Sequence, residues 1–303
     1  MANYYNENTV LYLNGSFVKA SEAKMDFYSQ SFHYGYSVFE GIRSYRTVTG
    51  ETKIFRAEAH YERLKNSAEA LNMPYSWSAG ELIAATYELL AKNNLQDAYI
   101  RPVVYAPANM SFNLNTESFI VIEVWEMAPF LGDKLLRVMS SSFQRPNPKG
   151  FKIHAKAAGH YVNSILASQE AKANGFDEAL LSDMNGNVAE GPGANVFFEK
   201  EGRLYTTAPG NILPGITRAT VLEICEELHI PVEEKLFTRE EMYGADAAFF
   251  CGTAAEVIGM HSLDDQPFTM AWENTVSKQI QDAYKELVVE KKGALVNEVL
   301  GVE

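Results

Sequence analysis

The sequence contains very little cysteine and has a shortage of positive charge, and each shortage excludes a class of protein. Its 303 residues include two cysteines, Cys225 and Cys251, whose number and spacing fit neither a disulfide framework nor a zinc site. We therefore expect no metal. Lysine and arginine total 26 against 39 aspartate and glutamate residues, which gives a formal net charge of −13. A chain with this charge repels phosphate backbones, so we expect no nucleic-acid partner.

The sequence also lacks long hydrophobic runs. No 18 apolar residues follow one another, and residues 1–8 contain no basic segment followed by an apolar one. A membrane-spanning helix needs the first feature and a secretion signal the second. We therefore expect no membrane partner and a cytoplasmic protein with reduced thiols. The hydrophobic fraction of 47% and the charged fraction of 21% are typical of a folded globular chain.

The length exceeds the roughly 100–200 residues of one domain and so favours two domains. The first part contains hairpin signals at Asn14–Gly15 and Thr49–Gly50, helical patterns over 56–71 and 82–92, and strand patterns over 98–106 and 118–125. Pro129 and Gly132 then interrupt the strand pattern. We expect a small N-terminal α+β domain over 1–127, a linker over 128–136 and a large C-terminal α/β domain over 137–303.

The second part alternates strands, helices and glycine turns, as α/β domains do. Strand patterns cover 136–143, 178–182 and 247–250, helical patterns cover 161–172, 217–228 and 274–288, and Asn185–Gly186 and Glu201–Gly202 mark hairpins. The alternation predicts a mixed α/β (α+β) fold.

One lysine in this part lies among small residues. Lys156 follows Ala155 and precedes Ala157, Ala158 and Gly159. A lysine shielded from water loses its proton more readily, and the neutral amine can attack a carbonyl carbon. Taken alone, however, this segment favours a plainer interpretation, which is a surface lysine at the end of a strand.

Two further segments have the chemistry to bind an anionic oxygen. Residues 213–218 precede a helical pattern, so the amides of Ile216 and Thr217 and the Thr217 hydroxyl would lie at a helix N-terminus, where phosphate binds. Residues 251–256 place small residues directly after a strand, with exposed amides and a hydroxyl. The alternatives are a proline–glycine turn with Thr217 as an ordinary N-cap, and a tight turn after the strand.

Four motifs occur in a fixed order in this half of the chain: KAAGHY from Lys156, AEGPGANVF from Ala189, LPGITR from Leu213 and GTAAE from Gly252. YGYSVFEGIR from Tyr34, FR from Phe55 and YIRP from Tyr99 precede them. Each motif is weak alone, but the ordered set is specific. Together they closely resemble the fold-type IV, pyridoxal-phosphate-dependent aminotransferases, specifically the branched-chain amino acid aminotransferases, over nearly the whole chain. The resemblance implies a two-domain, D-amino acid aminotransferase-like fold with the cofactor in the cleft between domains.

The resemblance also implies roles at the cofactor, pyridoxal 5'-phosphate. Lys156 holds it covalently and, once released by the substrate amine, moves the proton of the reaction. Glu190 matches the acidic residue that keeps the pyridine nitrogen protonated. Tyr161 matches a tyrosine near the phenolic oxygen. The other matching cofactor-binding positions, mainly around the phosphate, are Arg56, Ile216, Thr217, Gly252 and Thr253.

Substrate-binding roles follow from the same resemblance. Tyr99 and Arg101 match residues that receive carboxylates, and the arginine takes the second carboxylate of glutamate or 2-oxoglutarate. The remaining matching positions are Tyr34, Phe39, Phe130, Thr253 and Ala254, and Tyr34 crosses a dimer interface in the family. The implied reaction transfers the amino group of L-leucine, L-isoleucine or L-valine to 2-oxoglutarate, in a homodimer or an assembly of dimers. A largely apolar pocket with one arginine suits both kinds of substrate.

The chain departs from the common family pattern at three positions. His160 replaces a usual asparagine, Ala194 a usual glutamate and Phe130 a common tyrosine, and all three bear on fine specificity. Two alternatives keep the fold, a D-amino acid transaminase and an aminodeoxychorismate lyase. A more distant one is a non-catalytic scaffold that binds phosphate-bearing ligands. Retention of both Lys156 and Glu190 argues against the scaffold, because a binding protein needs neither group.

Overall fold

The computed structural model describes residues 4–127 and 131–291, and the chain divides into two compact units. Unit 1 is Met1–Ala128 with Ala155–His160, and unit 2 is Pro129–His154 with Tyr161–Glu303. The segment that carries Lys156 therefore groups with unit 1, whereas the sequence analysis assigned all of 137–303 to one domain. Within the predicted linker 128–136, residues 128–130 lie outside the described part. The domain bounds themselves stay a prediction.

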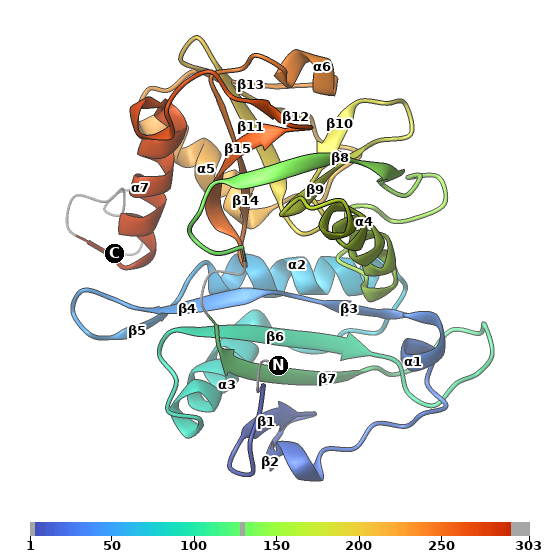
Figure 1. Ribbon diagram of the computed structural model, residues 1–303. Coiled ribbons are helices and arrows are strands. Elements are labelled where there is room, and N and C mark those ends of the chain that lie inside the picture. Colours follow the sequence, from blue (N-terminus) through green and yellow to red (C-terminus); the bar gives the residue numbers. More distant parts are fainter. Residues whose placement is uncertain (1–3, 128–130, 292–303) are drawn as a thin grey trace. The chain divides into compact units, whose positions relative to one another are not determined.

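Unit 1 is built on an antiparallel sheet, and its strands are labelled in Figure 1. In the described part, seven strands pair in the order β2-β1-β7-β6-β4-β5, and β3 pairs with β6. The strands are β1 (Val10–Leu13), β2 (Ser16–Lys19), β3 (Ser37–Phe39), β4 (Ile42–Arg46), β5 (Thr52–Ile54), β6 (Ala98–Tyr105) and β7 (Phe119–Glu126). Asn14 and Gly15 both adopt positive φ between β1 and β2, which confirms the predicted Asn–Gly hairpin.

Two amphipathic helices bury their apolar side chains in the core of unit 1. They are α2 (Ala57–Ala70) and α3 (Ala79–Lys92), and both were predicted. The Ser78 hydroxyl accepts a hydrogen bond from the Glu81 amide at 3.2 Å and so caps the start of α3. Leu64 and Leu89 are fully buried in the same cluster as Ile100 of the sheet. The short helix α1 (Gln30–Tyr34) and the 3₁₀ turns η1 (Ala20–Glu22) and η2 (Ala158–His160) were not predicted.

Unit 2 contains a mixed sheet. In its described part, nine strands pair in the order β10-β9-β8-β15-β14-β11-β12-β13, with β16 on β15. The pairs β8–β9, β8–β15 and β12–β13 are parallel, and the others are antiparallel. The strands are β8 (Leu136–Gln144), β9 (Glu178–Ser182), β10 (Val188–Glu190), β11 (Asn195–Lys200), β12 (Arg203–Thr207), β13 (Val232–Lys235), β14 (Ala247–Gly252), β15 (Glu256–Leu263) and β16 (Gln266–Pro267).

The helices of unit 2 cover this sheet. They are α4 (Tyr161–Ala173), α5 (Ile216–Glu227), α6 (Arg239–Met242) and α7 (Val276–Val288), with the 3₁₀ turn η3 (Trp272–Asn274). Helix α4 packs on β8 and β9, whereas α5 and α7 contact each other and β14. The three longer helices confirm the helical patterns of the sequence. No helix in the described part of the chain is both long and apolar enough to cross a bilayer. The mixed α/β class is confirmed.

Candidate active site

Lys156 is fixed within unit 1 by its own backbone. Its amide donates to the Ser67 hydroxyl of α2 at 3.0 Å, and its carbonyl accepts from the Phe39 amide of β3 at 3.1 Å. The next residue, Ala157, forms an antiparallel bridge with Val38. These contacts explain why the segment groups with unit 1. They also hold the lysine backbone independently of its side chain.

Two glycines permit the close approach of this segment to α1. The Gly159 amide donates to the Gly35 carbonyl at 3.1 Å. Gly35 ends α1 with a φ of +66°, and a Cβ atom on it would lie 2.8 Å from the Gly159 Cα. Both the left-handed conformation and the contact require glycine at position 35. Gly35 therefore allows the segment that carries Lys156 to pack closely against the end of α1.

The ring of Phe39 brings two predicted site residues together. The Lys156 Nζ lies 5.0 Å from its centroid, and the Arg101 Cζ lies 4.5 Å from it. Arg101 also lies near the rings of Tyr99 and Trp125, at 5.1 and 6.0 Å, and donates to the Tyr99 hydroxyl at 3.0 Å. Its buried Nε has no hydrogen-bond partner among the described residues. Unit 1 therefore places the Lys156 amine and the Arg101 guanidinium against the same Phe39 ring, and the guanidinium still has a free donor in the described part of the chain.

Trp125 is a member of this group that the sequence analysis missed. It lies directly opposite Tyr99 in the pairing of β6 with β7. The strand pattern over 118–125 included Trp125, but the pattern does not give the register between strands. Only the register reveals which residues share a face with Tyr99 and Arg101.

A buried network of charged side chains lies next to the lysine segment and was also missed. The Glu40 carboxylate accepts from Arg63 at 2.7 and 2.9 Å and lies 2.7 Å from His60 Nδ1. Burial raises the pKa of Glu40, but Arg63 and His60 outweigh it and hold that pKa well below its usual range. Burial lowers the pKa of His60, and the charge of Lys156 acts in the same direction. At neutral pH the network therefore holds an ionised Glu40 beside a neutral His60.

Arg56 directly precedes α2. Its backbone is left-handed, with a φ of +51°, and its guanidinium lies 5.7 Å from the Phe55 ring. It belongs to unit 1, whereas the other predicted phosphate ligands, Ile216, Thr217 and Thr253, belong to unit 2. Its role at the phosphate stays a prediction.

Glu190 ends β10 in unit 2 and is only 4% exposed, so it is not an exposed turn residue. Its carboxylate lies 2.8 Å from Arg145 Nε and accepts from Asn195 Nδ2 at 3.0 Å and from the Leu213 amide at 3.2 Å. A carboxylate surrounded by donors in this way is fixed in orientation. Arg145 was not predicted as a site residue because it is far from Glu190 in sequence, and Asn195, although part of the AEGPGANVF motif, was given no role.

Asn195 connects Glu190 to the start of α5. Its Nδ2 also donates to the Leu213 carbonyl at 3.1 Å, and its Oδ1 fills the space that a Cβ atom on Gly215 would need. Gly215 is the N-cap of α5 and contributes no capping side chain. The first amides of a helix have no partner within the helix, so those of Ile216 and Thr217 can donate to an anion at the start of α5. Thr217 is not the N-cap, which corrects the alternative interpretation of the motif.

The turn after β14 lies close to the same segment. Asn195 pairs with Cys251, and a Cβ atom on Gly252 would lie 3.0 Å from the Gly193 carbonyl. Gly252 pairs with Glu256 across a three-residue turn that contains Thr253 and Ala254. The segment is therefore a β-hairpin turn. Unit 2 brings Gly252 and its turn close to the Gly193–Asn195 segment, which also contacts Glu190 and the start of α5.

Tyr34, Tyr161 and Phe130 are the remaining predicted residues. Tyr34 is 49% exposed at the end of α1, and its ring packs 5.6 Å from that of Phe112. Tyr161 begins α4 in unit 2. Phe130 lies outside the described residues.

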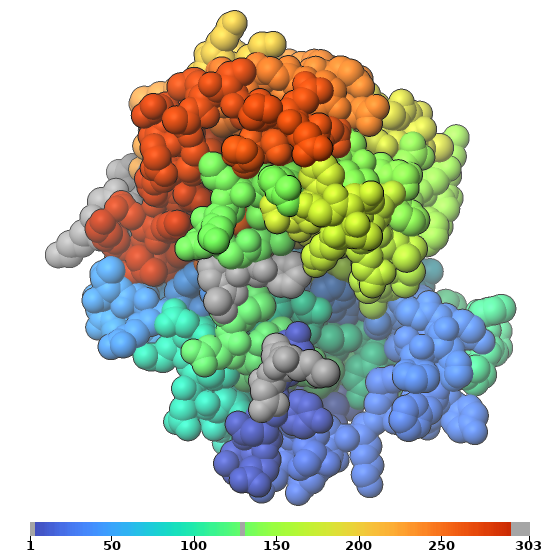
Figure 2. Space-filling view, viewed as in Figure 1, coloured from blue at the N-terminus to red at the C-terminus, as the bar shows by residue number. Residues whose placement is uncertain are grey.

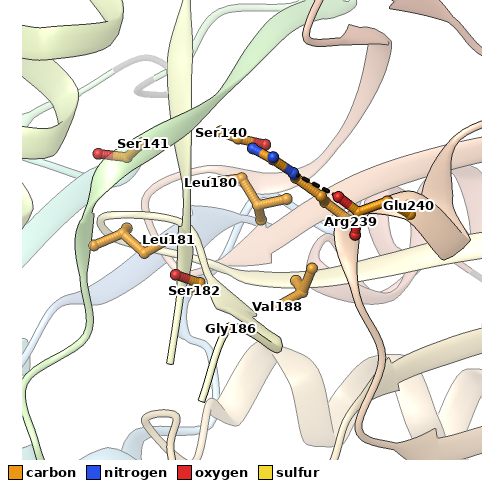
Figure 3. A pocket seen from close by; sticks show the side chains of 9 residues that line it. All are labelled: Ser140, Ser141, Leu180, Leu181, Ser182, Gly186, Val188, Arg239 and Glu240. Atoms are coloured by element: carbon orange, nitrogen blue, oxygen red, sulfur yellow. Dashed lines mark hydrogen bonds and ion pairs between the residues drawn. The ribbon is translucent and has the colours of Figure 1, made fainter. Parts of the chain in front are cut away.

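Unit 2 also has a pocket of about 250 Å³ that contains none of the predicted residues (Figure 3). It is lined by Ser140, Ser141, Leu180, Leu181, Ser182, Gly186, Val188, Arg239 and Glu240. The one ion pair among these side chains joins Arg239 to Glu240 at 2.9 Å, and both are exposed. We assign it no part in the site.

Comparison with known proteins gives consistent matches over nearly the whole chain. The family model for amino-transferase class IV matches residues 37–263. A branched-chain-amino-acid aminotransferase of Pseudomonas aeruginosa is 39% identical over 291 residues, which is 94% of each chain. The branched-chain aminotransferase of the archaeon Thermoproteus uzoniensis, solved with norvaline, has a TM-score of 0.90 at 36% identity and covers 94% of this chain and 96% of its own. The branched-chain amino acid aminotransferase of Thermobaculum terrenum, solved in its PLP-form, has a TM-score of 0.89 at 35% identity, with 95% and 96% covered.

Proposed function

The chain belongs to the amino-transferase class IV family, and from this membership we propose that it is a pyridoxal-phosphate-dependent branched-chain-amino-acid aminotransferase. It moves the amino group of L-leucine, L-isoleucine or L-valine to 2-oxoglutarate and releases the branched-chain 2-oxo acid and L-glutamate. The observation that carries the proposal is the Phe39 ring with the Lys156 amine and the Arg101 guanidinium both against it. In this arrangement Lys156 supplies an amine that can form an imine, Phe39 supplies an apolar surface, and Arg101 supplies a cation for a second carboxylate.

The predicted site residues carry chemical groups that match those of pyridoxal phosphate. Lys156 supplies the amine for its aldehyde, and the buried Glu190 supplies a fixed carboxylate for its ring nitrogen. The amides at the start of α5 and the Thr253 turn, together with Arg56, supply donors for its phosphate. Tyr161 is the proposed neighbour of its phenolic oxygen. When bound, the cofactor supplies a ring that accepts the electron pair left as the substrate α-carbon loses its proton.

Lys156 moves the proton in this mechanism. Its Nζ removes the proton from the substrate α-carbon and returns a proton in the reverse direction with the second substrate. The backbone contacts to Ser67 and Phe39 keep the amine in place for both steps. Glu190 would hold a proton at the ring nitrogen, and Arg145 and Asn195 orient its carboxylate for this role.

The side chains of the two substrates, one branched and one carrying a carboxylate, bind in turn in the same pocket. Phe39, Tyr99 and Trp125 provide ring surface for a leucine-like side chain, and Arg101 provides charge-assisted hydrogen bonds for the second carboxylate of 2-oxoglutarate. The α-carboxylate is assigned to the hydroxyl of Tyr99 and to the turn at Thr253 and Ala254. Phe130 is assigned to the same pocket on the resemblance alone.

We place the active enzyme in the cytoplasm as a homodimer or an assembly of dimers. Both cysteines are buried and unpaired, which fits a reducing compartment. Exposed aromatic and apolar side chains gather around α1 and the loop after β6, two segments that reach the surface in Figure 2. They include Phe27, Tyr28, Phe32, Tyr34, Phe112 and Leu114. Apolar surface of this kind supports a subunit interface.

The dimer is tested by sedimentation velocity. We expect the wild type to sediment as a dimer or larger, and Phe32→Ser with Phe112→Ser to shift it toward the monomer. The matched control is Leu228→Ser with Leu236→Ser, which removes two exposed apolar side chains from unit 2. A wild-type monomer at micromolar concentration contradicts the assignment.

The function is tested by the absorption spectrum of the purified holoenzyme. L-leucine should bleach the visible band of the bound cofactor, and 2-oxoglutarate should then restore it, because each substrate completes one half of the reaction. L-isoleucine and L-valine should act as leucine does, and D-alanine should have no effect. A band that responds only to D-alanine makes the protein a D-amino acid transaminase. A protein that binds no cofactor leaves the scaffold alternative.

A further inference from the structure

Glu123 lies directly opposite Arg101 in the sheet of unit 1. The pairing of β6 with β7 sets Arg101 against Glu123 and Tyr99 against Trp125. Opposed residues on antiparallel strands project to the same face, with Cβ atoms about 4.5–5.5 Å apart. Glu123 therefore occupies the same face as the aromatic group around Arg101. The resemblance to the family gave it no role.

The charge of Arg101 acts on Glu123, although the Glu123 side chain is exposed. The surrounding protein raises the pKa of Glu123, and the positive charge of Arg101 lowers it. Arg101 meanwhile donates to Tyr99, and its Nε has no hydrogen-bond partner in the described part of the chain. The guanidinium thus keeps donor capacity for a ligand while a carboxylate stands across the strands from it.

This arrangement affects the two kinds of substrate differently. A second carboxylate gains from the charge of Arg101, so a nearby negative charge weakens its binding. A leucine-like side chain binds mainly through the rings of Phe39, Tyr99 and Trp125, so the same negative charge has little direct effect on it.

We propose that Glu123 is a specificity-determining residue that weakens dicarboxylate binding relative to branched-chain binding by offsetting the charge of Arg101. The proposal rests on the proposed function, because it requires one pocket that accepts both kinds of side chain. It does not require Glu123 to touch the substrate.

The test compares Glu123→Gln with Glu126→Gln in the holoenzyme. Glu126 is exposed on the same strand, but it lies opposite Ala98 and projects to the other face. Both variants remove one negative charge, so only the position differs. Calorimetric titration with glutarate and with 4-methylvalerate measures binding of a dicarboxylate and of a branched monocarboxylate without turnover. Steady-state assays then give KM for 2-oxoglutarate and for L-leucine.

We expect Glu123→Gln to bind glutarate about two- to fivefold more tightly and to lower KM for 2-oxoglutarate by the same factor, the range of one partly exposed charge pair. Binding of 4-methylvalerate and KM for leucine should stay at the wild-type value, and Glu126→Gln should resemble the wild type throughout. In an Arg101→Met background, Glu123→Gln should have a smaller effect on glutarate, because only the direct repulsion between Glu123 and the ligand remains.

Two results overturn the proposal: unchanged glutarate binding in Glu123→Gln, and an equal change in Glu126→Gln, which shows an effect of net charge alone. Failure of the proposed function is a separate outcome. It shows as a wild type that does not transaminate leucine with 2-oxoglutarate, whatever the glutarate titrations give.

Discussion

Lys156→Ala will lower the turnover of L-leucine with 2-oxoglutarate by at least about 10³-fold, because in the proposed mechanism this side chain both holds the cofactor and moves the proton. The variant should fold normally. The contacts to Ser67 and Phe39 use the backbone of residue 156, which alanine retains. The measurement is the steady-state rate at saturating substrates, together with the visible spectrum of the protein after addition of pyridoxal phosphate.

The matched control is Lys152→Ala, an exposed lysine four residues earlier in the sequence. It removes the same charge and should keep the wild-type rate. Equal urea midpoints for the wild type and both variants would exclude unfolding as the cause of lost activity. A Lys156→Ala enzyme that retains a rate within tenfold of the wild type would sink the assignment of the catalytic lysine.

Glu190→Gln will lower kcat by about 10²–10³-fold, the range found when one preorganised electrostatic partner is removed. Glutamine keeps the size of the side chain, and its oxygen can still accept from the Asn195 amide and the Leu213 amide. What disappears is the negative charge that we propose holds a proton at the ring nitrogen. The free energy of unfolding should also fall by about 3–5 kcal/mol, because the buried Arg145 loses its charged partner.

A double variant separates the two effects. Arg145→Met with Glu190→Gln removes both charges, so much of the stability should return while kcat stays low. Glu227→Gln, an exposed glutamate on α5, is the control for loss of one negative charge. Urea unfolding and steady-state kinetics are measured on the same preparations. A Glu190→Gln enzyme that loses stability but keeps its kcat would show that the residue is purely structural.

Residues close in sequence were predicted well, because the forces that shape them are local. The helices α2, α3, α4, α5 and α7 follow from apolar spacing over three and four residues, and the hairpin at Asn14–Gly15 follows from turn chemistry. The strands β6 to β9 were found within one or two residues of their ends. The ordered motifs likewise identified the family, which the comparisons confirm.

Contacts between distant segments were not predicted, because they depend on packing and strand register. The sequence could not show that residues 155–160 pack on α2 and β3, nor that Arg145 and Asn195 reach Glu190. It also could not pair Trp125 with Tyr99 or Glu123 with Arg101, since a shift of one residue would turn every side chain of the strand to the other face.

The sequence by itself therefore determined the fold class, the family and the order of most elements, and it predicted roles for Lys156 and Glu190. These are set by local periodicity and by motifs a few residues long. Only the tertiary structure decided which side chains surround them. Their positions depend on which strands pair, and in which register, and that is settled by burying one continuous core rather than by any short stretch of chain.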